Sequence, residues 1–203
     1  MTTHSERDPK TDHLLTPENS ALLLIDYQPA LVSGTRSIEK EALINNVVAL
    51  AKAAKMFDLP IVLSTIGVNA GYQEKTVEEL QAVLPDVEPI DRTAVNAWEQ
   101  EEIRSAVEAT GRRKLLIAAL WTEVCLVFPA LDMLGDGYEV YAVSDASGGT
   151  SVDAHERGMQ RVVQAGAVPV TWEAVMAELA RLHKGDYIQN FVQIMQEHLP
   201  KSV

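Results

Sequence analysis

The sequence predicts an α/β fold: a three-layer, doubly wound sheet of six parallel strands with helices on both faces. Short, β-rich apolar segments alternate along the chain with longer segments that repeat apolar residues at helical spacing. The strand segments are apolar on both faces, which is typical of a parallel sheet that helices cover on each side. The length of 203 residues and the hydrophobic content of 47% suit one globular domain.

Six segments have the composition of strands, and the third of them has the weakest pattern. In chain order they are residues 21–25, 61–65, 87–90, 115–120, 139–143 and 167–170. Ligands of such sheets bind beyond the carboxyl ends of the strands. Residues that carry chemistry are therefore expected directly after the last residue of a strand.

Five segments between the predicted strands have the periodicity of helices. They are residues 38–57, 75–84, 99–109, 122–134 and 153–164. After the last strand, two further helices are predicted at residues 172–183 and 187–198. The final helix carries an apolar stripe that either covers the core of its own domain or meets another subunit. The stripe consists of Ile188, Phe191, Val192, Ile194 and Met195.

Three regions are expected along the chain. Residues 1–16 are interpreted as a flexible N-terminal arm, because the segment is polar and Pro9 and Pro17 discourage regular structure around it. Residues 17–182 form the globular domain. Residues 183–203 form a C-terminal helical extension, which is expected at a subunit interface.

The composition excludes several classes of partner and site. Lys and Arg number 17 against 29 Asp and Glu, and the net charge of −12 disfavours nucleic acid and anionic membrane surfaces as partners. One cysteine cannot form an intramolecular disulfide or supply paired thiolates to a metal. No segment resembles a signal peptide or a membrane span, and a cytoplasmic location is expected.

Three residues follow predicted strands and have side chains suited to chemistry. Asp26 follows the first strand, Arg92 follows the weak third strand, and Cys125 lies in the first turn of the helix after the fourth strand. Amides at a helix N-terminus and a nearby Arg favour a thiolate, so the sequence predicts a lowered pKa for Cys125. Asp26 alone is interpreted as a loop cap, and a lone cysteine is most often an inert core residue.

Other arrangements of reactive residues are weaker. Asp145, Ser147 and His155 suggest a serine hydrolase, but the DASGG segment lacks the G-x-S-x-G turn that would expose the serine. His155 is interpreted as a capping or packing residue at the start of a helix. Neither G-x-G-x-x-G nor G-x-x-x-x-G-K-[ST] occurs, which removes the main support for nucleotide binding.

The D-x-Q that closes the first strand, the basic residue after the third strand and the T-x-x-C after the fourth resemble the isochorismatase-like cysteine hydrolases. The likeness covers residues 16–182, so the domain at 17–182 is identified as an isochorismatase-like hydrolase domain with a Rossmann-like sheet. The segments LLLIDYQPAL, VNAW, WTEVCLVFPAL and VSDASG resemble the YcaC-type branch most closely. That branch is octameric, so the resemblance implies a homo-oligomer.

The resemblance also implies roles for individual residues. Asp26 falls on the family's base, Cys125 on its nucleophile, and Arg92 on a position where nicotinamidases have Lys. Arg stays charged in proteins, so Arg92 is expected to act as an electrostatic partner and not as a proton carrier. The family's cis peptide falls on the bond between Leu120 and Trp121, and the backbone amides of Trp121 and Cys125 are then the expected oxyanion hole.

The remaining implications concern the pocket and the metal. Gln28, Trp98 and Trp121 lie within the matching motifs and are expected to line the substrate pocket. Nicotinamidases bind a metal through Asp-x-His after the second strand, and the corresponding STIGVNAGYQEK contains neither residue. No metal and no cofactor are therefore expected.

Together these features predict a metal-independent cysteine hydrolase that cleaves a C–N bond of a small amide, carbamoyl or ureido compound through a thioester. The expected partners are a small-molecule substrate and further copies of the chain, without nucleic acid or membrane. Two alternatives remain open: a catalytically idle or regulatory small-molecule-binding oligomer that keeps the fold, and a structural assembly protein.

Overall fold

A computed structural model describes residues 8–181 and 185–199. The predicted six-stranded parallel sheet is confirmed, and its strand order is β3-β2-β1-β4-β5-β6. The strands are β1 (Ser20–Ile25), β2 (Ile61–Ile66), β3 (Ile90–Arg92), β4 (Lys114–Ala119), β5 (Glu139–Val143) and β6 (Val168–Val170). This is the order of a doubly wound, Rossmann-like sheet, in which the direction of winding reverses between β1 and β4.

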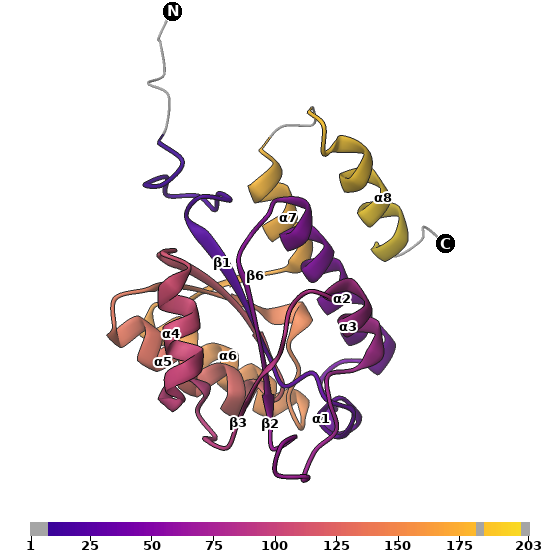
Figure 1. Cartoon of the computed structure of the whole chain (residues 1–203), viewed down its shortest axis with the longest axis vertical. Helices are drawn as coiled ribbons and strands as arrows, with labels where there is room; N and C mark the ends of the chain where they lie inside the picture. Colours follow the sequence, from indigo (N-terminus) through magenta and orange to yellow (C-terminus); the bar gives the residue numbers. More distant parts are fainter. Residues whose placement is uncertain (1–7, 182–184, 200–203) are drawn as a thin grey trace, which may run out of the picture.

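Helices cover both faces of the sheet, which makes three layers (Figure 1). One face carries α1 (Pro29–Gly34), α2 (Lys40–Met56), α3 (Glu78–Val83), α7 (Trp172–Ala180) and α8 (Ile188–His198). The other face carries α4 (Glu101–Ala109), α5 (Val127–Gly135) and α6 (Val152–Ala165). Every residue of β1 and β4 is buried, because these central strands are covered from both sides.

The structure differs from the sequence prediction at several elements. β3 begins at Ile90, so the strand expected at 87–90 is displaced and Arg92 is its last residue. The short helix α1 was not predicted, and α3 is shorter than the expected 75–84. The expected helix at 122–134 is divided into a five-residue π-helical turn, η2 (Thr122–Leu126), and α5. Two 3-10 turns, η1 (Ala97–Glu99) and η3 (Ser144–Ala146), complete the elements.

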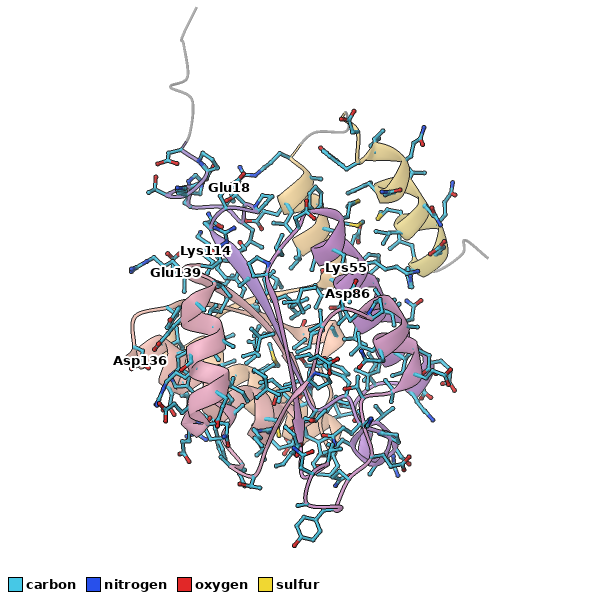
Figure 2. All side chains as sticks on the ribbon, in the orientation of Figure 1. Glu18, Lys55, Asp86, Lys114, Asp136 and Glu139 are labelled. Carbon is cyan, nitrogen blue, oxygen red and sulfur yellow. The ribbon has the colours of Figure 1, made fainter. Side chains whose placement is uncertain are left out.

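The segment before β1 contacts the domain. Leu15 is fully buried, and its N–H donates to Glu178 Oε1 at 2.7 Å. Lys114, which lies beside Glu139 at the amino end of the sheet (Figure 2), donates to the His13 carbonyl at 2.5 Å. Residues 13–15 therefore contact the domain, and the flexibility of the arm at residues 1–16 stays a prediction. Residues 1–7 and the domain boundary expected at 182/183 lie outside the described residues.

The last helix packs on its own chain. Phe191 and Ile194 of α8 are buried in the core on the α2 side of the sheet, and Lys52 of α2 pairs with Glu197 at 2.6 Å. Val192 remains 42% exposed. Most of the apolar stripe thus covers the domain's own core, and a subunit interface at residues 183–203 stays a prediction. Among the described helices, none is long and apolar enough to cross a membrane.

Candidate active site

Asp26 and Arg92 form a buried ion pair at the carboxyl ends of β1 and β3. Arg92 Nη1 lies 2.5 Å from Asp26 Oδ1, and Nη2 lies 2.7 Å from Oδ2. Neither side chain is exposed to solvent. Two parallel hydrogen bonds of this kind compensate two charges that would be costly to bury alone. Asp26 has a φ of 66°, a left-handed conformation that Asp tolerates better than most residues and that occurs here directly after β1.

Further contacts fix the guanidinium of Arg92. Nη1 donates to Ser64 Oγ at 3.2 Å and to the Thr65 carbonyl at 3.1 Å, and Nη2 donates to the Val95 carbonyl at 3.3 Å. Ser64 was not predicted as a site residue from the sequence. The available signal was a hydroxyl near the end of β2, in a strand that is otherwise mostly apolar.

Cys125 completes the cluster from the turn after β4. Its Sγ lies 3.9 Å from Arg92 Nη2, and the residue is 7% exposed. The charge of Asp26 acts on the thiol. The structure therefore brings Asp26, Arg92 and Cys125 together beside the point where the winding of the sheet reverses. This is the position at which open α/β sheets bind ligands.

The environment of Cys125 favours a protonated thiol. Burial raises the pKa of Cys125 to about 12, and the charge and hydrogen bond of Asp26 act in the same direction. The Arg92 charge and the backbone contact with Trp121 oppose this increase and are smaller. The predicted lowering of the pKa is wrong, because burial and a neighbouring carboxylate outweigh the Arg charge and the turn amides.

The backbone of the turn also differs from the expected helix N-terminus. The Cys125 N–H donates to the Trp121 carbonyl at 2.8 Å, and the Val124 N–H donates to the same oxygen at 3.0 Å. The Cys125 amide is therefore already engaged, contrary to its expected place in an oxyanion hole. The Trp121 indole N–H donates to the Leu31 carbonyl at 3.0 Å, and its ring packs so closely on α1 that a side chain at Gly34 would overlap it.

The other residues expected to line the pocket have structural partners. Gln28 is fully buried; its amide N–H donates to the carbonyls of Ile66 and Glu74, and its Oε1 accepts from the Ile66 N–H. The Trp98 indole N–H donates to Asp136 Oδ2 at 2.7 Å. Their role toward a substrate stays a prediction. Within the described residues, no group of three or more His, Cys, Asp or Glu side chains is arranged to hold a metal ion.

Comparison with known proteins identifies the family. The isochorismatase domain model matches residues 20–174, which include Asp26, Arg92 and Cys125. The chain belongs to the isochorismatase family. It is 40% identical over 187 residues to a protein of Escherichia coli (strain K12) named probable hydrolase YcaC, covering 92% of this chain and 89% of that protein.

Two solved structures of YcaC proteins have the same fold. YcaC from Pseudomonas aeruginosa, described with hexane-2,5-diol and covalent acrylamide, has a TM-score of 0.88 and 36% identity, covering 94% of each chain. The Escherichia coli YcaC gene product, described as an octameric hydrolase of unknown specificity, has a TM-score of 0.87 and 39% identity. That match covers 94% of this chain and 93% of the other.

One backbone feature expected from the family is present in this member. The bond between Leu120 and Trp121 is a cis peptide, as the resemblance implies. Arg92 occupies the position at which the resemblance implies Lys in nicotinamidases, and its two hydrogen bonds to Asp26 fit a guanidinium better than a single ammonium group.

Proposed function

We propose that this member of the isochorismatase family is a metal-independent cysteine hydrolase that cleaves a C–N bond of a small amide, carbamoyl or ureido compound. One observation carries the proposal: Cys125 and the carboxylate of Asp26 share one buried cluster, in which Arg92 pairs with Asp26 and lies 3.9 Å from the Cys125 Sγ. A thiol and a nearby base that can take its proton are the minimum requirement for covalent acyl transfer.

The first half of the reaction forms a thioester. Because the pKa of Cys125 is about 12, the thiol is protonated at neutral pH. Asp26 therefore accepts the thiol proton as Sγ attacks the carbonyl carbon. The C–N bond of the tetrahedral intermediate then breaks, and Asp26 returns the proton to the departing nitrogen.

The second half hydrolyses the thioester. Asp26 takes a proton from water as the water oxygen attacks the acyl carbon, and the C–S bond breaks. The proton then passes to the sulfur, which restores the thiol. Arg92 holds the carboxylate in position through both halves and transfers no proton. The Trp121 N–H is the proposed oxyanion donor, because the Cys125 N–H is bonded to the Trp121 carbonyl.

The relatives support this assignment and add a proposal about assembly. The Escherichia coli YcaC protein is named a probable hydrolase, and its structure is described as that of a hydrolase. The Pseudomonas aeruginosa YcaC structure is described with covalent acrylamide, an electrophilic amide. The Escherichia coli YcaC structure is described as octameric. We propose that this chain also self-associates, and sedimentation velocity at micromolar concentration tests that proposal. A monomer under those conditions would reject it.

The activity is tested with a panel of small amides, ureides and carbamoyl compounds, with ammonia or amine release as the measurement. Cys125→Ala is run beside the native chain. Asp91→Asn serves as a control, because Asp91 neighbours Arg92 on β3 but is hydrogen-bonded to Thr65, Val68 and Asn69. We expect release by the native chain and by Asp91→Asn, and none above background by Cys125→Ala. Equal release by Cys125→Ala and the native chain would contradict the proposal.

The second candidate is a catalytically idle or regulatory protein that binds small molecules in the same place. The observation in its favour is the high pKa of Cys125, which leaves very little thiolate at neutral pH. The two candidates predict different results with the panel. An idle protein binds a compound, detected as a shift in melting temperature, and releases no ammonia or amine from it.

A further inference from the structure

A second set of polar contacts, in which Asp26 takes no part, holds the turn that carries Cys125. Thr122, the first residue of the turn, is fully buried, and its Oγ1 lies 2.7 Å from Nδ1 of His155 in α6. The Thr122 N–H donates to the Gly148 carbonyl at 2.9 Å. The start of the turn is thus bonded through both its side chain and its backbone.

The next residue of the turn is bonded to the same region. Glu123 Oε1 accepts from the N–H of Thr150 at 3.1 Å and from its hydroxyl at 2.6 Å. The other carboxylate oxygen of Glu123 is buried without a hydrogen-bond partner among the described residues. The Glu123 side chain is therefore fixed by the loop that leads into α6, and its negative charge lies near the N-terminus of that helix, where the helix dipole favours it.

Two glycines allow α6 to approach this closely. A Cβ at Gly158 would lie 3.1 Å from Thr122 Cγ2 and 3.2 Å from Glu123 Cα. A Cβ at Gly149 would lie 2.7 Å from Glu123 Oε2 and 2.8 Å from the backbone nitrogen of His155. The turn and α6 are therefore in contact along the backbone, with no space for either to shift toward the other.

We propose that His155 is a positioning residue: through its hydrogen bond to Thr122 it fixes the turn that presents Cys125 to Asp26. The inference rests on the proposed function, because it concerns the same nucleophile. Cys125 lies three residues after Thr122 in one five-residue turn, so a change in the position of Thr122 is passed directly to the thiol. Within the part of the chain that the structure describes, the His155 side chain forms no hydrogen bond or ion pair with Cys125, Asp26 or Arg92, and it acts through the turn.

The state of His155 fits this role. Burial lowers the pKa of His155, and Glu123 and Glu156 oppose that change less strongly. A neutral imidazole carries one donor and one acceptor nitrogen, so it can pair with a hydroxyl in either direction. Asn places an amide group near the position of Nδ1, and Leu does not, which provides a conservative variant and a disruptive one at the same site.

The test compares His155→Leu with His155→Asn, and Thr122→Val with Thr122→Ser. The measurement is the rate of iodoacetamide labelling of Cys125 at pH 8.5, followed by intact mass, with kcat on a panel amide measured in parallel. The high thiol pKa depends on burial and on contact with Asp26. Losing the position of the turn should therefore speed labelling at least tenfold and lower kcat, while Asn and Ser should stay within twofold of the native chain.

Two results distinguish positioning from loss of stability. Thr171→Val removes a helix-capping hydroxyl far along the chain, and it should lower the melting temperature without changing the labelling rate. The double variant His155→Leu with Thr122→Val should label no faster than either single variant, because the two substitutions remove the same hydrogen bond between Thr122 and His155. If His155→Leu does not fold, Thr122→Val, which is nearly isosteric, carries the test with Thr122→Ser as its partner.

The proposal is overturned by labelling within twofold of native in both disruptive variants, by an equal increase in Thr171→Val, or by increases that multiply in the double variant. Labelling does not require turnover. If the native chain releases no ammonia or amine but the labelling pattern holds, the positioning role stands and the proposed function fails.

Discussion

Asp26→Asn tests the balance of charges in the site, because it removes one charge and keeps the shape of the side chain. Asp26 receives two hydrogen bonds from Arg92, and both side chains are inaccessible to solvent. The substitution leaves the Arg92 charge buried without a carboxylate. Breaking a buried ion pair in this way costs about 3–5 kcal/mol, so the free energy of unfolding should fall by that amount.

The same change should make the thiol more reactive. The pKa of Cys125 is raised from its ordinary 9.0 to about 12, which lowers its thiolate fraction at pH 8 about a thousandfold relative to an unperturbed thiol. Two of the three causes that raise this pKa come from Asp26, and the opposing Arg92 charge remains in the variant. Iodoacetamide labelling at pH 8 should therefore accelerate at least tenfold, while turnover is lost because no base accepts the thiol proton.

The assay pairs labelling kinetics, followed by intact mass, with urea unfolding of the native chain and the variant. Asp91→Asn is the matched control, since Asp91 neighbours Arg92 on β3 but accepts from Thr65 and from the N–H groups of Val68 and Asn69. It should leave labelling unchanged. If Asp26→Asn does not fold, the neutral pair Asp26→Asn with Arg92→Met replaces it, and it should fold without recovering turnover. Unchanged or slower labelling in the folded Asp26→Asn variant would refute the reasoning.

Three further outcomes are expected. Between pH 9 and 12 the folded state keeps the Cys125 proton and the unfolded state releases it. The free energy of unfolding should therefore fall with rising pH by about 1 kcal/mol per pH unit more in the native chain than in Cys125→Ser. Parallel plots of unfolding free energy against pH for the two chains would contradict the high pKa. Gly158→Ala should destabilise the fold by about 1–3 kcal/mol, because the Glu123 backbone lies 3.2 Å from the new Cβ, and this outweighs the better helix propensity of Ala. A gain in melting temperature would show that α6 can move. Leu15→Ala should lower the free energy of unfolding in urea by about 2–5 kcal/mol, because Leu15 is fully buried, and Leu14→Ala should lower it less. Equal decreases would show that the segment is not anchored through Leu15.

The fold could be predicted because strong periodicity specifies it. The β1 and β4 segments are apolar after their first residues, Ser20 and Lys114, and lie at the centre of the sheet. The amphipathic segments between the strands form the covering helices. β3 was misplaced because it is a three-residue edge strand with the sequence IDR, which has no apolar run to mark it. α1 was missed because a six-residue helix is too short for periodicity to register.

The sequence was sufficient to predict which residues form the site, but not the direction in which their surroundings shift the pKa of Cys125. Asp26 directly follows β1, and Cys125 lies in the turn after β4, at the sheet edge where parallel topology brings side chains together. The sign of the Cys125 pKa shift depends on burial and on which neighbour is closer, and neither is encoded in local sequence. The contact of His155 with Thr122 joins residues 33 positions apart, so its partner was visible only in three dimensions.

The central claim is that Cys125 forms an acyl intermediate with Asp26 as its base. An activated ester such as 4-nitrophenyl acetate tests it most directly, because it needs no knowledge of the natural substrate. The account predicts a burst of nitrophenolate equal to the concentration of the chain, and an acetyl group on Cys125 in the mass spectrum of the acid-quenched protein. Release without a burst, at the same rate in the native chain and in Cys125→Ala, would contradict it.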